Sequence, residues 1–123
     1  MAQEIDLITL KDPRSAVAEA YRTLRTNLTF TELDNPIESL VVASPAPGNE
    51  DATVIANLAV AMAQGERRTI LVDANLRQPC LHEIFDVDNE TGLTTMIVKE
   101  TAHENPPLMD VGIENLWLLP SGP

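Results

Sequence analysis

The stretch from Ser44 to Thr53 has the pattern of a loop that holds phosphate groups. It follows an apolar run, Leu40-Val41-Val42-Ala43, and precedes a helical pattern from Val54 to Ala63. A phosphate-holding loop needs small residues, so that its backbone N–H groups converge on the anion, and Gly48 is a suitable turn glycine. Such a loop also needs a lysine for the β- and γ-phosphates and a Ser or Thr hydroxyl for Mg²⁺. Whether the stretch can bind a nucleotide therefore depends on whether it has that lysine and that hydroxyl.

The residues at the end of this loop lack the required chemical groups. Glu50, Asp51 and Ala52 occupy the positions of a glycine, the lysine and the hydroxyl. A contact between like charges at 4 Å costs about 1 kcal/mol in water and about 4 kcal/mol at an effective dielectric constant of 20. The carboxylates would instead favour the dipole of the following helix by about 0.3 to 1 kcal/mol. We predict that Glu50 or Asp51 lies near the first N–H groups of that helix, and that nucleotide affinity is low.

A second carboxylate follows the next apolar run. The segment Arg68-Thr69-Ile70-Leu71-Val72-Asp73 predicts a buried strand that ends in an acid, at the edge where ligands bind open α/β sheets. Asp73 either works near a metal or closes the end of the strand. Without a lysine and a metal partner, we favour the second interpretation.

Strand and helix patterns alternate along the chain. We expect an extended arm over residues 1–11 and a helix from Pro13 to about Leu28, capped by Asp12 or Ser15. The other expected elements are strands over 39–44, 68–73 and 115–119, a helix over 53–64 with Gly65 as its C′ residue, helical turns over 81–85 and 94–98, and a loop over 99–112. This order predicts one α/β domain over residues 1–123 with a parallel sheet. Three strands are fewer than a doubly wound α/β domain usually has, which indicates that only part of such a fold is present.

The first helix has two contrasting faces. Its apolar residues form one stripe, which we expect to pack: Val17, Tyr21, Leu24 and Leu28. Its charged residues spread over the opposite side: Glu19, Arg22 and Arg25. They form either a solvated face with one i,i+3 ion pair, worth about 0.2 to 0.5 kcal/mol, or a self-association surface.

Composition and charge exclude several classes of function. The 123 residues carry a formal net charge of −11, which disfavours nonspecific binding to nucleic acid or to an anionic membrane. The single cysteine, Cys80, excludes an internal disulfide, and no paired Cys/His spacing indicates zinc. No apolar run approaches the length of a membrane span, and the N-terminus lacks the basic start of a signal peptide. We therefore expect a cytoplasmic protein.

Several motifs, in this order and spacing, resemble the cytoplasmic kinase domain of bacterial tyrosine kinases in capsular and exopolysaccharide biosynthesis. These kinases belong to the deviant Walker group of P-loop ATPases. The resemblance is carried by the Glu-x-x-Arg-x-x-Arg helix within residues 18–27, by 56–60, by the second Walker-like motif at 70–79, and by 81–82, 92–93 and 112–122. It implies a partial P-loop-like, three-layer α/β domain whose small parallel sheet is flanked by helices, and it implies that the charged helix serves self-association.

The resemblance also implies a vestigial nucleotide site. Its positions are Gly48, Thr53, Asp73 and Arg77, with Glu50, Asp51 and Ala52 as disabling substitutions and Pro45 in place of a small residue. The acidic position between Asp73 and Arg77 is Asn75, and a carboxamide lacks the negative charge that a Mg²⁺ site needs. The kinases use ATP and Mg²⁺; here we expect no cofactor, no metal and no catalytic residue. Their third acidic motif and C-terminal tyrosine cluster have no counterpart, which predicts a degenerate, C-terminally truncated relative.

Two functional hypotheses follow from the resemblance. The first is a catalytically inactive relative that acts through protein–protein association or regulation. Its partner would be an active polysaccharide tyrosine kinase, the membrane activator of such a kinase or a second copy, contacted through Glu19, Arg22 and Arg25, which would place it at the inner face of the plasma membrane. The alternative is an ATP-binding tyrosine kinase or ATPase domain whose remaining motifs lie outside this chain.

Overall fold

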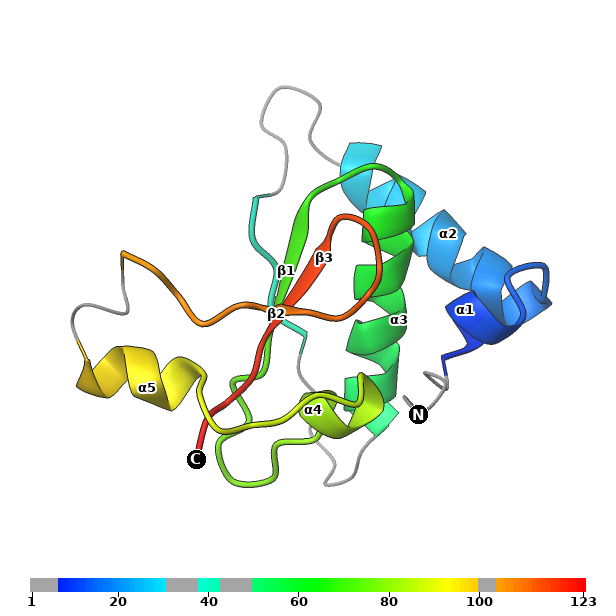
Figure 1. Ribbon diagram of the computed structural model, residues 1–123. Coiled ribbons are helices and arrows are strands. Elements are labelled where there is room, and N and C mark those ends of the chain that lie inside the picture. The colour runs from blue at the N-terminus through cyan, green and yellow to red at the C-terminus, as the bar shows by residue number, and fades with distance from the viewer. Residues whose placement is uncertain (1–6, 31–37, 43–49, 100–103) are drawn as a thin grey trace.

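The computed structural model describes residues 7–30, 38–42, 50–99 and 104–123 of the chain (Figure 1). The elements in these ranges are α1 (Ile8–Lys11), α2 (Ala16–Phe30), α3 (Glu50–Gln64), β1 (Thr69–Val72), α4 (Leu81–Ile84), α5 (Leu93–Val98), β2 (Met109–Asp110) and β3 (Leu116–Leu119). Helices α1, α2 and α3 lie together beside a small sheet (Figure 1). The α/β class and the small sheet flanked by helices are confirmed.

The sheet has the order β1-β3-β2. Strands β1 and β3 are parallel, in a register that runs from Thr69 opposite Leu116 to Val72 opposite Leu119. Both were predicted from the sequence. Strand β2 lies within the predicted loop over 99–112 and pairs antiparallel with β3. It forms because a tight turn brings the chain back, with Gly112 and Asn115 at positive φ values of 80° and 69°.

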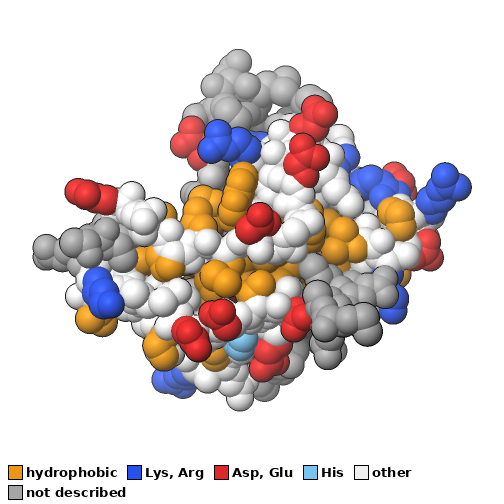
Figure 2. Space-filling model, in the orientation of Figure 1, with side chains coloured by type: hydrophobic (Ala, Val, Ile, Leu, Met, Phe, Trp, Pro, Cys, Tyr) orange, Lys and Arg blue, Asp and Glu red, His pale blue; other side chains and the backbone are white. Residues whose placement is uncertain are grey.

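The core lies between α3 and one face of the sheet. Helix α3 contributes small residues that are almost fully buried: Ala56, Ala59, Val60 and Ala63. They pack against buried leucines of the strands: Leu71, Leu116 and Leu118. Small side chains let the helix backbone approach the sheet closely, so the alanine-rich pattern of this helix determines its position. Apolar side chains are visible across the middle of the molecule, over the strands and α3 (Figure 2).

The N-terminal residues are packed into the fold. The prediction of an extended arm over 1–11 is wrong for Ile8–Lys11, which form the helical turn α1, and residues 1–6 lie outside the described ranges. Thr9, 1% exposed, donates from its N–H and its hydroxyl to Asn57 Oδ1 at 3.1 and 2.8 Å. A buried polar pair of this kind must be satisfied internally, so it holds α1 against α3.

Helix α2 packs through a face that only partly matches the predicted one: Tyr21 and Leu28 of the predicted stripe are half-buried. Ala18 is fully buried, whereas Val17 and Leu24 are 54% and 39% exposed. Arg25 reaches inward, and its Nη1 donates to Ala61 O at 2.7 Å. Ala61 belongs to the last turn of α3, where the helix dipole favours a cation, and its carbonyl oxygen also accepts a hydrogen bond from Gly65 N at 3.1 Å. This contact places Arg25, which was predicted on the charged side, against α3.

The start of α2 supports one of the two predicted caps. Ser15 Oγ accepts a hydrogen bond from Ala18 N at 3.1 Å, so Ser15 and not Asp12 caps the helix. The helix therefore begins at Ala16, three residues after Pro13.

The predicted strand over 39–44 is not formed by the described residues 38–42, and residues 43 and 44 lie outside them. Leu40 and Val41 are 49% and 88% exposed instead of buried. A fully buried parallel strand needs a neighbouring strand at its edge. Within the described ranges, no strand pairs with this segment.

The end of α3 differs from its prediction in one residue. Glu66 N donates to Ala63 O at 3.0 Å and Arg67 N to Met62 O at 3.3 Å, which is the Schellman pattern. The left-handed C′ residue is therefore Glu66, at φ 66°, and not Gly65. Gly65 lies against the Arg25 side chain: a Cβ there would be 3.1 Å from Cδ of Arg25, so the arginine would have to shift by a few tenths of an ångström.

We expect Glu66→Gly to stabilise the fold by about 0.5 to 1 kcal/mol, because glycine adopts the left-handed conformation without the Cβ penalty. Chemical denaturation measures the change. Glu66→Ala removes the same carboxylate but keeps Cβ, so its free energy of unfolding should stay within about 0.5 kcal/mol of the parent. Equal stabilisation by both substitutions would contradict this account.

Candidate functional site

The carboxylate of Asp73 is the centre of the candidate site. The residue follows β1 directly and is 4% exposed. Its Oδ1 accepts a hydrogen bond from Asn75 N at 3.1 Å, and its Oδ2 accepts from Cys80 N and Leu81 N at 3.2 Å each. Leu81 begins α4, whose first N–H groups have no helical partner. The carboxylate therefore joins the end of β1 to the start of α4, as the strand-closing interpretation predicted.

The residues between Asp73 and α4 form a turn that depends on side-chain oxygens. Asn75 Oδ1 accepts a hydrogen bond from Gln78 N at 3.2 Å. Arg77 lies in this turn and is exposed to solvent. Cys80 is half-buried, forms no disulfide and packs against the core. The turn thus places Asp73 inward and Arg77 outward, so their side chains differ sharply in exposure.

The phosphate-loop half of the predicted site lies mostly outside the described residues. Gly48 and the side chains of Glu50 and Asp51 belong to that part, so their placement at the start of α3 stays a prediction. Helix α3 does begin at Glu50, and Ala52 is 8% exposed. Thr53 is exposed, and its carbonyl oxygen accepts a hydrogen bond from Asn57 Nδ2 at 2.9 Å.

The described parts of the predicted site lie at one end of the molecule. The start of α3, the turn after β1 and α4 are all found at that end (Figure 1). Among the described residues, no three His, Cys, Asp or Glu side chains gather in a way that could hold a metal ion.

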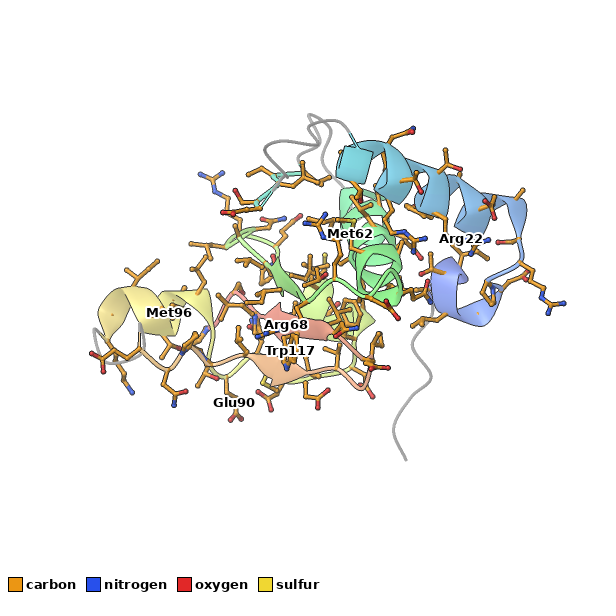
Figure 3. All side chains as sticks on the ribbon, turned by 90° about the horizontal axis from the view of Figure 1, so that it is seen from above. Arg22, Met62, Arg68, Glu90, Met96 and Trp117 are labelled. Carbon is orange, nitrogen blue, oxygen red and sulfur yellow. The ribbon has the colours of Figure 1, made fainter. Side chains whose placement is uncertain are left out.

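The predicted ion pair on α2 is present. Arg22 Nη2 donates to Glu19 Oε2 at 2.6 Å, and Arg22 Nη1 donates to Pro13 O at 2.6 Å. Arg22 lies along the side of α2 that carries this contact (Figure 3). An exposed pair contributes about 0 to 1 kcal/mol, so the contact mainly fixes the guanidinium in place. Of the predicted interface residues, Glu19 has the most exposed side chain, at 66%, and Arg25 is directed toward α3.

Sequence reasoning missed the residues that hold the end of the chain. Asn89 Nδ2 donates to Ser121 Oγ and to Gly122 O at 3.1 Å each, and Gly122 N donates to Asn89 Oδ1 at 2.7 Å. Gly92 lies so close that a Cβ there would be 2.1 Å from Pro120 O. These contacts join segments about 30 residues apart, so no local pattern could indicate them.

Comparisons with known proteins identify the group to which this arrangement is related. No protein-family profile matches the chain. The tyrosine-protein kinase YwqD of Bacillus subtilis is 36% identical over 118 residues, which are 96% of this chain and 49% of YwqD. The putative tyrosine-protein kinase CapB of Staphylococcus aureus is 33% identical over 90% of this chain and 48% of CapB. The chain is a relative of the bacterial tyrosine kinases.

Solved structures give the same result for the fold of this tyrosine-kinase relative. All of the chain superposes on 54% of the chimerical protein CapA2B2, with a TM-score of 0.87 and 35% identity. The kinase domain of the Escherichia coli tyrosine kinase ETK gives a TM-score of 0.85 at 27% identity, over 99% of this chain and 48% of that one. The chain therefore spans about half the length of the curated relatives and solved chains named here. No helix in the described ranges is long and apolar enough to cross a membrane.

We expect Asp73→Asn to lower the free energy of unfolding by about 1 to 3 kcal/mol, because the amide places N–H donors against buried N–H donors. Thermal or chemical denaturation of the purified chain measures it. Asp88→Asn is the matched control, since Asp88 is exposed and its Oδ1 accepts one bond, from Glu90 N at 3.3 Å. Asp73→Asn with the stability of the parent would show that the carboxylate does not close the strand.

Proposed function

We propose that this tyrosine-kinase relative is catalytically inactive and acts by associating with another protein. The observation that carries the proposal is the state of Asp73. Both of its carboxylate oxygens accept backbone hydrogen bonds from the turn and from α4. An ionised carboxylate has about four acceptor sites, and three of them are used here by backbone N–H groups, so little of its acceptor capacity is left for a metal.

The sequence of the phosphate loop supports the same proposal. Asp51 stands where the tyrosine kinases that the chain resembles have lysine, and Ala52 stands where they have a hydroxyl. The exchange replaces an attraction for polyphosphate by a repulsion, each of about 1 to 4 kcal/mol. With Asn75 in place of an acid, the charges that would hold Mg·ATP are reduced on both sides of the site.

The surface for association is the exposed side of α2. Val17 and Leu24 are large apolar residues exposed to solvent on one edge of the helix, and Glu19 lies on the charged side. Arg22 is held by Glu19 and by Pro13 O, so it presents a fixed charge. A charge that is already fixed loses little conformational entropy on binding. Exposed apolar side chains favour association because their burial removes apolar surface from water. The proposed partner is an active polysaccharide tyrosine kinase, its membrane activator or a second copy.

Calorimetric titration with Mg·ATP tests the loss of the nucleotide site. We expect no binding up to millimolar ATP for the parent chain. The triple variant E50G/D51K/A52S should regain measurable binding, because it restores the lysine and the hydroxyl. Serine is chosen over threonine since Ala52 is 8% exposed and has little room for added volume. Binding by the parent chain would instead support the alternative, an ATP-binding kinase or ATPase domain.

Light scattering with intact YwqD tests the association. We expect a complex whose affinity falls at least about tenfold in the double variant V17D/L24D, since charge is introduced into the contact. I97D/V98D is the matched control, because it makes the same kind of change at two exposed apolar positions of α5, away from α2 (Figure 1). Arg25 is left unchanged, since its bond to Ala61 O holds α2 against α3. No complex with YwqD, or equal losses in both variants, would refute the proposed surface.

A further inference from the structure

Tyr21 stands at the boundary between the packed and the exposed faces of α2. It is the only tyrosine of the chain, and it is half-buried. At about 100° per residue, Tyr21 lies about 60° around the helix from the fully buried Ala18 and about 40° from Val17, which is 54% exposed. Helix α2 lies on the side of α3 away from the sheet (Figure 1). The ring of Tyr21 is therefore at the edge of the contact with α3 and beside the proposed association surface.

The hydroxyl of Tyr21 reaches solvent. Among the described residues, the buried side-chain atoms that lack a hydrogen-bond partner are His82 Nδ1 and Thr94 Oγ1. Within the same residues, no hydrogen bond of Tyr21 Oη is found, and Oη is not one of these buried atoms, so it is in contact with solvent. Tyrosine commonly keeps its ring against apolar neighbours and its polar tip in water. Tyr21 thus presents a hydroxyl group at the surface of α2.

The proposed partner of α2 gives this hydroxyl a chemical role. The relatives YwqD and CapB are a tyrosine-protein kinase and a putative one. A kinase that binds the edge formed by Val17, Tyr21 and Leu24 would have the only tyrosine of this chain within its contact. We propose that Tyr21 is a phosphorylation site for the partner kinase, with ATP as the phosphoryl donor. The inference rests on the proposed association and names its regulation.

The reaction transfers the γ-phosphoryl group of ATP to Tyr21. The hydroxyl oxygen attacks the γ-phosphorus and forms the new O–P bond, while the bond from the γ-phosphorus to the oxygen that bridges to the β-phosphate breaks. ADP leaves with that bridging oxygen, and the hydroxyl proton passes to a basic group of the kinase or to water. The partner supplies Mg·ATP and the catalytic groups, so Asp51 and Ala52 of this chain do not hinder the step.

Arg25 is placed to stabilise the phosphorylated form. It follows Tyr21 by four residues, the spacing at which two side chains of a helix meet. Its Nη1 donates to Ala61 O, and within the described ranges no hydrogen bond of its other two nitrogen atoms is found. A phosphate on tyrosine carries about −1.5 to −2 charges at pH 7 and three strong acceptor oxygens. The remaining donors of Arg25 would bind these oxygens while the bond to α3 is kept.

Phosphorylation of Tyr21 would end the association. Val17 and Leu24, which flank Tyr21 on the exposed edge of α2, contribute to binding by burying apolar surface. A phosphate between them would bring up to two negative charges into this contact, and the single charge of Arg25 would compensate only part of them. Burying a charge that is not fully paired is costly. The partner kinase should therefore release the chain once Tyr21 is modified.

Intact-mass spectrometry tests the modification, with YwqD that phosphorylates a synthetic copolymer of glutamate and tyrosine in the same assay. After incubation with YwqD and Mg·ATP, we expect the chain to gain one phosphate, and fragmentation should place it on Tyr21. Tyr21→Phe is the matched control, because it keeps the ring and removes the acceptor oxygen, and it should gain no phosphate. An unmodified parent chain, under conditions that modify the copolymer, would overturn the inference.

Light scattering then tests the release. The phosphorylated chain should bind YwqD at least about tenfold more weakly than the unmodified chain, whereas Tyr21→Phe should bind about as well as the parent. Thermal melting checks that the phosphorylated chain remains folded. Equal affinities of the phosphorylated and unmodified chains would overturn the regulatory role. A complex with YwqD that yields no phosphotyrosine would overturn the inference and leave the association standing, whereas absence of both would refute the two proposals together.

Discussion

The packing of α3 against β1 and β3 is the contact on which the other parts of the fold depend. Its alanines bring the helix backbone close to the leucines of the strands. The same helix also holds α1 through Asn57 and α2 through the carbonyl of Ala61. Helix α3 packs against the sheet on one side and against α1 and α2 on the other. A change in the position of α3 would therefore displace the sheet and both helices.

The position of α3 also determines what the candidate site can do. Its first residues and the turn after β1 lie at the same end of the molecule (Figure 1). In this chain the end of β1 is closed by Asp73, whose carboxylate is occupied by backbone N–H groups. The charge of Asp73 therefore serves the stability of the turn and of α4.

Among the described strands, β1 pairs with a neighbour, β3, on one edge only. A parallel sheet is normally covered on both faces, and here α3 covers one face while Ile70 and Val72 remain exposed. The apolar segment 38–42 lies near β1, and within the described ranges it has no strand partner. Local sequence favours a strand in this segment, but strand structure requires a neighbour that supplies hydrogen bonds.

The sequence by itself determined the elements that depend on local pattern: strands β1 and β3, the helices α2 to α5, and the strand-closing role of Asp73. It did not determine which face of α2 packs, because the bond from Arg25 to Ala61 O joins residues 36 positions apart. For the same reason β2, the turn α1 and the contacts of Asn89 could not be read from periodicity. Periodicity records which residues share a face of one element, whereas the partner of that face is decided by which elements the folded chain brings together.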